Sequence, residues 1–167
     1  MREIVLLLDN IRSAHNVGAI LRTAEGLGVK RVYALGLTPY PRQAGDTRLP
    51  HVSARASRAI AKTALGSERQ VVCQPAERPH QLIKELKASG YTLIGLEQTP
   101  DSRPLTGYTA GGSRRLALIV GHEVKGLSSG LLAKCDVVLA IPMAGKKESF
   151  NVSAAAAMAV YHLTFNA

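Results

Sequence analysis

The sequence predicts an α/β fold in which a mainly parallel sheet carries helices on both faces. Six short apolar segments alternate with segments of helical periodicity, the pattern of parallel strands joined by crossover helices. The chain has 167 residues, of which 46% are hydrophobic, and this suits one domain with a sizeable core. No internal repeat or linker interrupts it, so we expect a single domain over residues 1–167.

The first strand and the first helix are clearly marked. Residues 3–8 (EIVLLL) form a continuous apolar run, as expected for a strand buried on both faces. A helix is predicted next because apolar residues recur at helical spacing, at Val17, Ile20, Leu21, Ala24 and Leu27. Asn16 is a candidate N-cap for this helix, and Gly28 is a candidate C-terminal stop.

The later elements continue the alternation. Further strands are expected at residues 31–35, 70–73, 91–96, 116–120 and 137–141. Helices are expected near residues 52–64, 79–89, 128–134 and 151–164. Three irregular polar loops each follow a predicted strand, at residues 97–115, 121–127 and 142–150. Since ligands bind at the carboxyl edge of an open α/β sheet, these loops predict one composite pocket.

The chain is strongly basic. It has 21 Lys and Arg against 12 Asp and Glu, a formal net charge of +9, which favours a polyanionic partner such as RNA. Aromatic side chains, on which single-stranded bases usually stack, are scarce. Basic proteins without a nucleic-acid partner are also common, so the charge alone leaves this question open.

Composition also bears on the cellular compartment. The two cysteines, Cys73 and Cys135, lack metal-ligand spacing, which argues for a reducing compartment and against a zinc site. The N-terminus does not have the pattern of a secretory leader. The longest weakly polar stretch, residues 152–165, is shorter than the roughly 20 residues of a membrane span. We therefore expect a cytoplasmic protein with no metal and no membrane partner.

The first segment with candidate chemistry lies on the first predicted helix. Asn16, Gly18 and Arg22 stand there in the order N-x-G-x-x-x-R. Gly18 would allow close backbone approach, and the two polar side chains lie away from the apolar stripe. A tolerated glycine and a solvated arginine are the plain alternative.

The second segment follows the strand predicted at residues 116–120. Gly121, Glu123 and Gly126 form a G-x-E-x-x-G turn, in which glycine lets the backbone lie against a flat ligand. Glu123 lies near a predicted helix start, where a carboxylate is favoured electrostatically. Two turn glycines around an ordinary acidic helix-start residue would give the same pattern.

The third segment opens the last predicted helix. Ser149, Asn151 and Ser153 occupy alternate positions there, and any one of them could be the N-cap. Three such residues exceed what one helix start requires. No GxGxxG, GxxxxGK[ST], GxSxG or HExxH motif accompanies these segments.

In this order, the three segments resemble motifs 1, 2 and 3 of the SpoU-type RNA ribose 2′-O-methyltransferases of the SPOUT superfamily. Motif 3 of that family usually reads S-L-N-V-S, and Phe150 replaces the Leu here. The resemblance implies a C-terminal trefoil knot that binds S-adenosylmethionine. It also implies a homodimer whose active site combines motif 1 of one subunit with the cofactor loops of the other. The implied substrate is tRNA or rRNA, and tRNA is favoured because the chain resembles the minimal members of the family, several of which act on tRNA.

The resemblance also implies roles for single residues. The catalytic group would be Arg22 with Asn16, Glu123, Ser149 and Asn151. The cofactor contacts would be Leu96, Gly121, Ile141, Ser149 and Phe150. A guanidinium stays protonated in proteins, so Arg22 is expected to grip the target phosphate and orient the hydroxyl rather than to act as the base.

RNA binding requires a basic surface. Arg55, Arg58 and Lys62 share one face of the helix predicted at residues 52–64. The surface would extend to Arg42 and Arg48 and, around the expected pocket, to Arg114, Arg115, Lys146 and Lys147. A solvated helix face explains the first three residues equally well.

Two other classes of protein are compatible with the composition. A catalytically silent RNA-binding protein with the same fold would be free to lose the motif residues, all of which are present. An ordinary nucleotide-binding α/β enzyme would need a phosphate-binding loop, and the sequence has no such motif.

Overall fold

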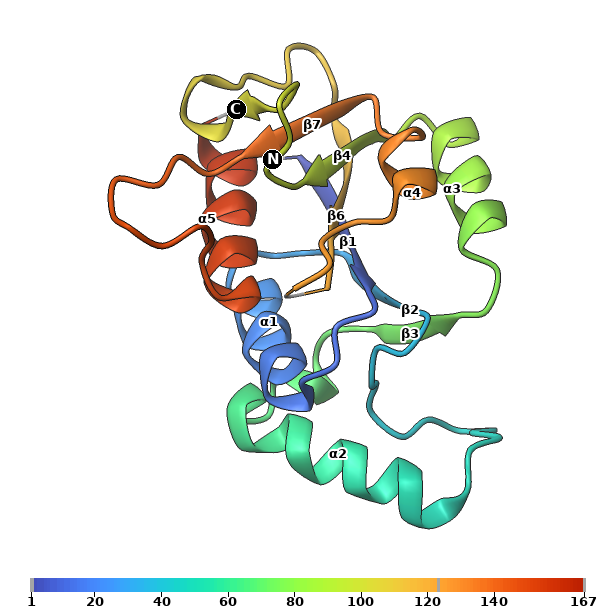
Figure 1. Ribbon diagram of the computed structural model, residues 1–167. Helices are drawn as coiled ribbons and strands as arrows, with labels where there is room; N and C mark the ends of the chain where they lie inside the picture. Colours follow the sequence, from blue (N-terminus) through green and yellow to red (C-terminus); the bar gives the residue numbers. More distant parts are fainter. Residues whose placement is uncertain (1, 123, 167) are drawn as a thin grey trace.

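The computed structural model describes residues 2–122 and 124–166, which form a seven-stranded parallel sheet with helices on both sides (Figure 1). The strand order is β3-β2-β1-β6-β4-β7-β5. The strands are β1 (Glu3–Asp9), β2 (Arg31–Leu35), β3 (Cys73–Ala76), β4 (Thr92–Leu96), β5 (Arg103–Pro104), β6 (Arg115–Val120) and β7 (Val137–Ala140). The helices are α1 (Ala14–Gly26), α2 (Pro50–Ala64), α3 (Pro79–Ala88), α4 (Ser129–Leu132) and α5 (Val152–Phe165).

The core lies on both faces of the sheet, as the sequence predicts. Ile4, Leu6 and Leu8 of β1 belong to a cluster with buried residues of α1, α2 and α5. Val5 and Leu7 of the same strand belong to a second cluster with α3 and α4. Successive side chains of a strand point to opposite faces of the sheet, so the continuous apolar run of β1 is buried on both faces. The parallel α/β prediction is therefore confirmed, whereas the knot stays a prediction of the family resemblance.

Three details differ from the sequence-based expectations. The third strand lies at residues 73–76 rather than 70–73, because a 3₁₀ turn at Ser67–Arg69 occupies the preceding segment. The loop expected at residues 97–115 contains β5, a two-residue edge strand too short to show a periodic pattern. The N-cap of α1 is Ser13 and not Asn16, since the Ser13 hydroxyl accepts a hydrogen bond from the Asn16 N–H (3.2 Å).

Gly18 sets the distance between α1 and α2. A Cβ atom at this position would lie 2.2 Å from both the Ile60 carbonyl oxygen and the Thr63 hydroxyl oxygen. The same hydroxyl donates to the His15 carbonyl (2.8 Å), which adds a polar link between the helices. The close backbone approach expected at Gly18 is thus confirmed, and it is made to α2.

The order of the strands brings three loops together. β6 lies between β1 and β4, and β7 pairs with β4 on its other side. Because all these strands are parallel, the segments that follow β4, β6 and β7 leave the sheet at the same edge (Figure 1). The composite pocket is expected at this edge.

Candidate active site

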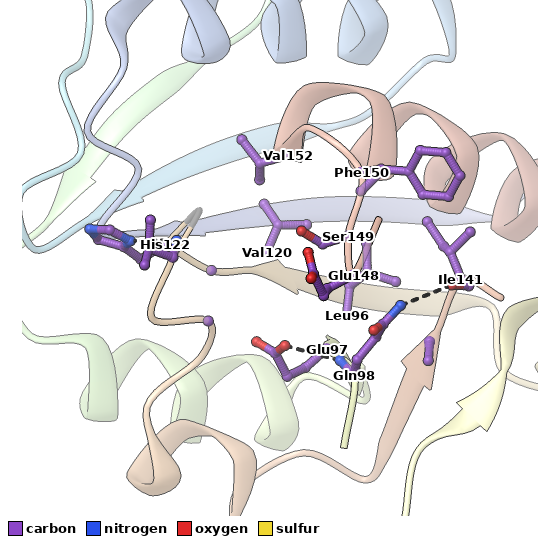
Figure 2. A pocket seen from close by; sticks show the side chains of 15 residues that line it. Leu96, Glu97, Gln98, Val120, His122, Ile141, Glu148, Ser149, Phe150 and Val152 are labelled. Atoms are coloured by element: carbon purple, nitrogen blue, oxygen red, sulfur yellow. Dashed lines mark hydrogen bonds between the residues drawn. The ribbon is translucent and has the colours of Figure 1, made fainter. Parts of the chain in front are cut away.

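A cavity of about 270 Å³ opens at the carboxyl ends of β4, β6 and β7. All five residues expected to bind the cofactor line it: Leu96, Gly121, Ile141, Ser149 and Phe150. Figure 2 shows that the lining comes from segments that follow different strands, with His122 at one end and Ile141 toward the other. The walls are mostly apolar, with polar side chains at Glu97, Gln98, His122, Glu148 and Ser149.

The turn that follows β6 forms one wall of the cavity. A Cβ atom at Gly121 would lie 2.7 Å from the backbone of Gly126 and Leu127, so a glycine is required for the turn to fold back on itself. The Gly126 N–H donates to the His122 carbonyl (2.9 Å). The Nδ1 atom of the His122 ring accepts from the Val124 N–H (3.0 Å) and the Lys125 N–H (3.3 Å). Glu123 lies outside the described residues.

The first and third motifs meet beside the cavity. The Asn151 side-chain amide donates to the Asn16 side-chain oxygen (3.2 Å), across 135 positions of sequence. Asn151 is also the N-cap of α5, where its side chain accepts from the Ser153 N–H (2.9 Å) and the Ser153 hydroxyl (2.6 Å). One residue therefore fixes the start of the last helix and contacts motif 1.

Arg22 is exposed on α1 and does not line the cavity within its own chain. Asn16 precedes it by six positions on the same helix. A helix turns 100° per residue, so the two side chains point in directions about 120° apart. Arg22 can therefore meet a ligand that approaches from outside the subunit.

Asp9 is a buried polar residue that the sequence reasoning missed. It ends β1 next to β6, and its exposed fraction is 6%. Burial raises the pKa of its carboxyl group, while a hydrogen bond from the Asn10 side chain and the charge of His122 oppose this shift. A carboxylate directly after a buried apolar strand was the available signal.

Residues 3–161 match the model of the SpoU rRNA methylase family. The chain belongs to the SpoU rRNA methylase family. It is 28% identical over 165 residues to Bacillus subtilis YacO and 32% identical over 161 residues to a Staphylococcus aureus protein, both named for the TrmH family of tRNA/rRNA methyltransferases. Each alignment covers 95% of this chain, and the chain spans 57% of the length of these relatives.

Solved structures share the SpoU fold over nearly the whole chain. A TrmH/SpoU tRNA-modifying enzyme from A. aeolicus superposes with a TM-score of 0.77 at 23% identity, covering 96% of this chain and 73% of its own. An AdoMet-bound rRNA methyltransferase from Sinorhizobium meliloti gives 0.76 at 23% identity, covering 96% and 56%. A structure that concerns 2-OH methylation of C/U34 on tRNA gives 0.71 at 22% identity, covering 96% and 93%.

The basic residues of this SpoU domain divide into two groups. Arg55, Arg58 and Lys62 are exposed on α2. Arg42 lies close to this helix, since its backbone N–H donates to the Ser57 hydroxyl (2.7 Å). These four residues, together with the exposed loop residues Lys146 and Lys147, are free to meet a large ligand.

Three of the expected RNA contacts are placed differently. Arg48 is held within the chain, because its guanidinium binds Asp46 (2.5 Å), donates to the Tyr40 carbonyl (3.0 Å) and covers the Tyr40 ring (3.5 Å). Arg114 and Arg115 lie at the amino end of β6, not around the pocket. At about 3.3 Å per residue, Arg115 is roughly 20 Å from Gly121. The expectation that Arg114 and Arg115 lie beside the pocket is therefore wrong. The loop that leads into β6 ends at the amino edge of the sheet, whereas the pocket lies at the carboxyl edge.

The described residues show neither a metal site nor a membrane-spanning helix. Within residues 2–122 and 124–166, no group of three or more His, Cys, Asp or Glu side chains is arranged to hold a metal ion. In the same part of the chain, no helix has the length and apolar character to cross a membrane.

Proposed function

We propose that this protein transfers a methyl group from S-adenosylmethionine to a ribose 2′-hydroxyl in structured RNA. The observation that carries the proposal is the single cavity lined by all five expected cofactor residues. The Asn151–Asn16 contact links this cavity to motif 1. Membership of the SpoU rRNA methylase family supports RNA as the substrate.

The cavity suits S-adenosylmethionine on its own chemistry. Leu96, Val120 and Ile141 offer apolar surface for a flat ring, and Phe150 adds an aromatic face. The Glu148 carboxylate and the Ser149 hydroxyl offer acceptors for the ribose hydroxyls and the amino group. When bound, the cofactor supplies a methyl group on a positively charged sulfur. An AdoMet-bound structure among the fold neighbours supports the same cofactor.

The residues of the chain then have to bring the hydroxyl to that methyl group. Arg22 binds the phosphate next to the target ribose and stabilises the charge that develops on the oxygen. Asn16, Ser149 and Asn151 supply hydrogen bonds that orient the ribose. Glu123 of motif 2 is the remaining member of the expected catalytic group.

A homodimer brings Arg22 to a cofactor cavity. Arg22 does not line the cavity of its own chain, so we place it at the cavity of a second subunit. α5 offers a surface for this contact, since Tyr161 and Phe165 are each more than half exposed and their rings lie 5.1 Å apart. Light scattering at micromolar concentration should give twice the chain mass. A monomer with full activity would contradict the shared site.

The RNA lies on the basic side of the molecule. Arg55, Arg58 and Lys62 form one face of α2 and Arg42 lies beside this helix, while Lys146 and Lys147 belong to the loop that carries the cavity residues Glu148 and Ser149. Arg114 and Arg115 can contact only the part of a large RNA that extends to the opposite edge of the sheet. Transfer RNA is the favoured substrate; two fold neighbours are named for tRNA, whereas the family model and a third neighbour are named for rRNA. A cytoplasmic location remains a prediction.

The test is methyl transfer to RNA. The protein should move a labelled methyl group from S-adenosylmethionine to cellular RNA, and a Gly121→Val variant should not, because the side chain would collide with the backbone of Gly126 and Leu127. A silent RNA-binding protein would retain RNA without labelling it. Failure of the unaltered protein to bind S-adenosylmethionine would refute the proposal.

A further inference from the structure

Glu97 and Gln98 follow β4 directly and reach toward two other strands. The Glu97 N–H donates to the Leu139 carbonyl (2.9 Å), which extends the pairing of β4 with β7 by one residue. The Gln98 side-chain amide donates to the Ile141 carbonyl (3.3 Å), just beyond the end of β7. Both side chains line the cavity (Figure 2).

The Glu97 carboxylate is hydrogen-bonded to the turn that follows β6. One oxygen accepts from the Leu127 N–H (2.7 Å) and the other accepts from the Gln98 N–H (3.0 Å). Leu127 is buried, so its N–H has little access to water in place of this carboxylate. Two consecutive residues therefore link the three segments that form the cavity.

Gly126 explains how the carboxylate comes so close. Its φ angle is +65°, a conformation that favours glycine. A Cβ atom there would also lie 2.1 Å from one Glu97 carboxylate oxygen. The second glycine of the G-x-E-x-x-G motif thus makes room for Glu97.

We infer that Glu97 is a positioning residue that holds residues 121, 122 and 124–127 in the shape that binds the cofactor. This inference rests on the cofactor pocket proposed above. A carboxylate is needed because both backbone partners are donors, and a glutamine would place an NH₂ donor against one of them. Glu97 acts through the turn and has no part in the methyl transfer itself.

The test compares Glu97→Gln with Glu77→Gln, which removes the same charge from an exposed position after β3. Calorimetry with S-adenosylmethionine alone should show about tenfold weaker binding for Glu97→Gln, the effect of losing one hydrogen bond to a charged group. Hydrogen exchange of the cofactor-free protein should accelerate at residues 121, 122 and 124–127 and at Gln98, whose N–H also donates to this carboxylate, and should stay unchanged in the rest of the described chain. Glu77→Gln should match the unaltered protein in both measurements.

A double-mutant cycle tests the fit between Glu97 and Gly126. Gly126→Ala should weaken cofactor binding more strongly in the unaltered protein than in a Glu97→Ala background, where the collision is removed. The inference is overturned by unchanged binding and exchange in Glu97→Gln, by faster exchange throughout the chain, or by equal effects of Gly126→Ala in both backgrounds. No RNA is present in these assays, so a wrong assignment of the methylated group would leave their outcome unchanged.

Discussion

Gly18→Ala perturbs the contact between α1 and α2. The new Cβ atom would lie 2.2 Å from the Ile60 carbonyl oxygen and the Thr63 hydroxyl oxygen, and ordinary contact begins near 3.4 Å, so the helices must move apart by roughly 1 Å. Overpacking of this kind destabilises a protein by about 1–3 kcal/mol. The better helix propensity of alanine offsets at most about 1 kcal/mol. We expect a net loss of about 1 kcal/mol, or about 2–4 °C in melting temperature for a chain of this size.

Gly26→Ala is the matched control on the same helix. No atom lies within 4 Å of the position that its Cβ would take, and its φ angle is not in the left-handed region. Its melting temperature should equal that of the unaltered protein or exceed it slightly. Thermal unfolding followed by circular dichroism measures both variants. Equal melting of Gly18→Ala and Gly26→Ala would refute the close-packing argument.

Three other predictions concern RNA, catalysis and the thiols. A triple variant of α2 replaces Arg55, Arg58 and Lys62 by alanine. It should bind RNA more weakly and with a flatter salt dependence, while its affinity for the cofactor should change little. An unaltered salt slope would mean that the RNA lies elsewhere. Arg22→Ala should reduce single-turnover methyl transfer by about 100-fold or more with cofactor affinity intact, and Arg22→Lys should restore little because it lacks the planar fork. Near-normal transfer by the alanine variant would refute this role. Burial raises the pKa of Cys73 to about 12 and that of Cys135 to about 11, so iodoacetamide should label neither thiol rapidly between pH 7 and 9 until the protein is unfolded. Rapid labelling of the folded protein would contradict this burial.

The sequence predicts the layers of this fold well because its strands are short, apolar and separated by helical periodicity. β1 is an example, since its uninterrupted apolar run reflects burial on both faces. β5 escaped prediction because two exposed residues on a sheet edge have no pattern. Ser13 was missed as a helix cap because the apolar stripe predicted for α1 begins at Val17, which makes Asn16, the residue directly before it, the nearer candidate.

The site was predictable where the motif residues are themselves the contacts. Gly121 and Ser149 line the cavity as expected, and Asn16 contacts Asn151. Glu97 was missed because its role depends on a hydrogen bond to Leu127, which is distant in sequence. Arg115 was misplaced because the loop that leaves the carboxyl edge of the sheet after β4 ends at the amino edge, where β6 begins.

The most direct test of the central claim is the position of the new methyl group on the RNA. RNA treated with the protein and isotopically labelled S-adenosylmethionine is digested to nucleosides, and each labelled nucleoside is identified by mass spectrometry. The proposed function predicts that the label resides on ribose as 2′-O-methylnucleosides, and that it disappears with Arg22→Ala. Label on a base, or RNA that remains unlabelled while the protein binds both ligands, would contradict it.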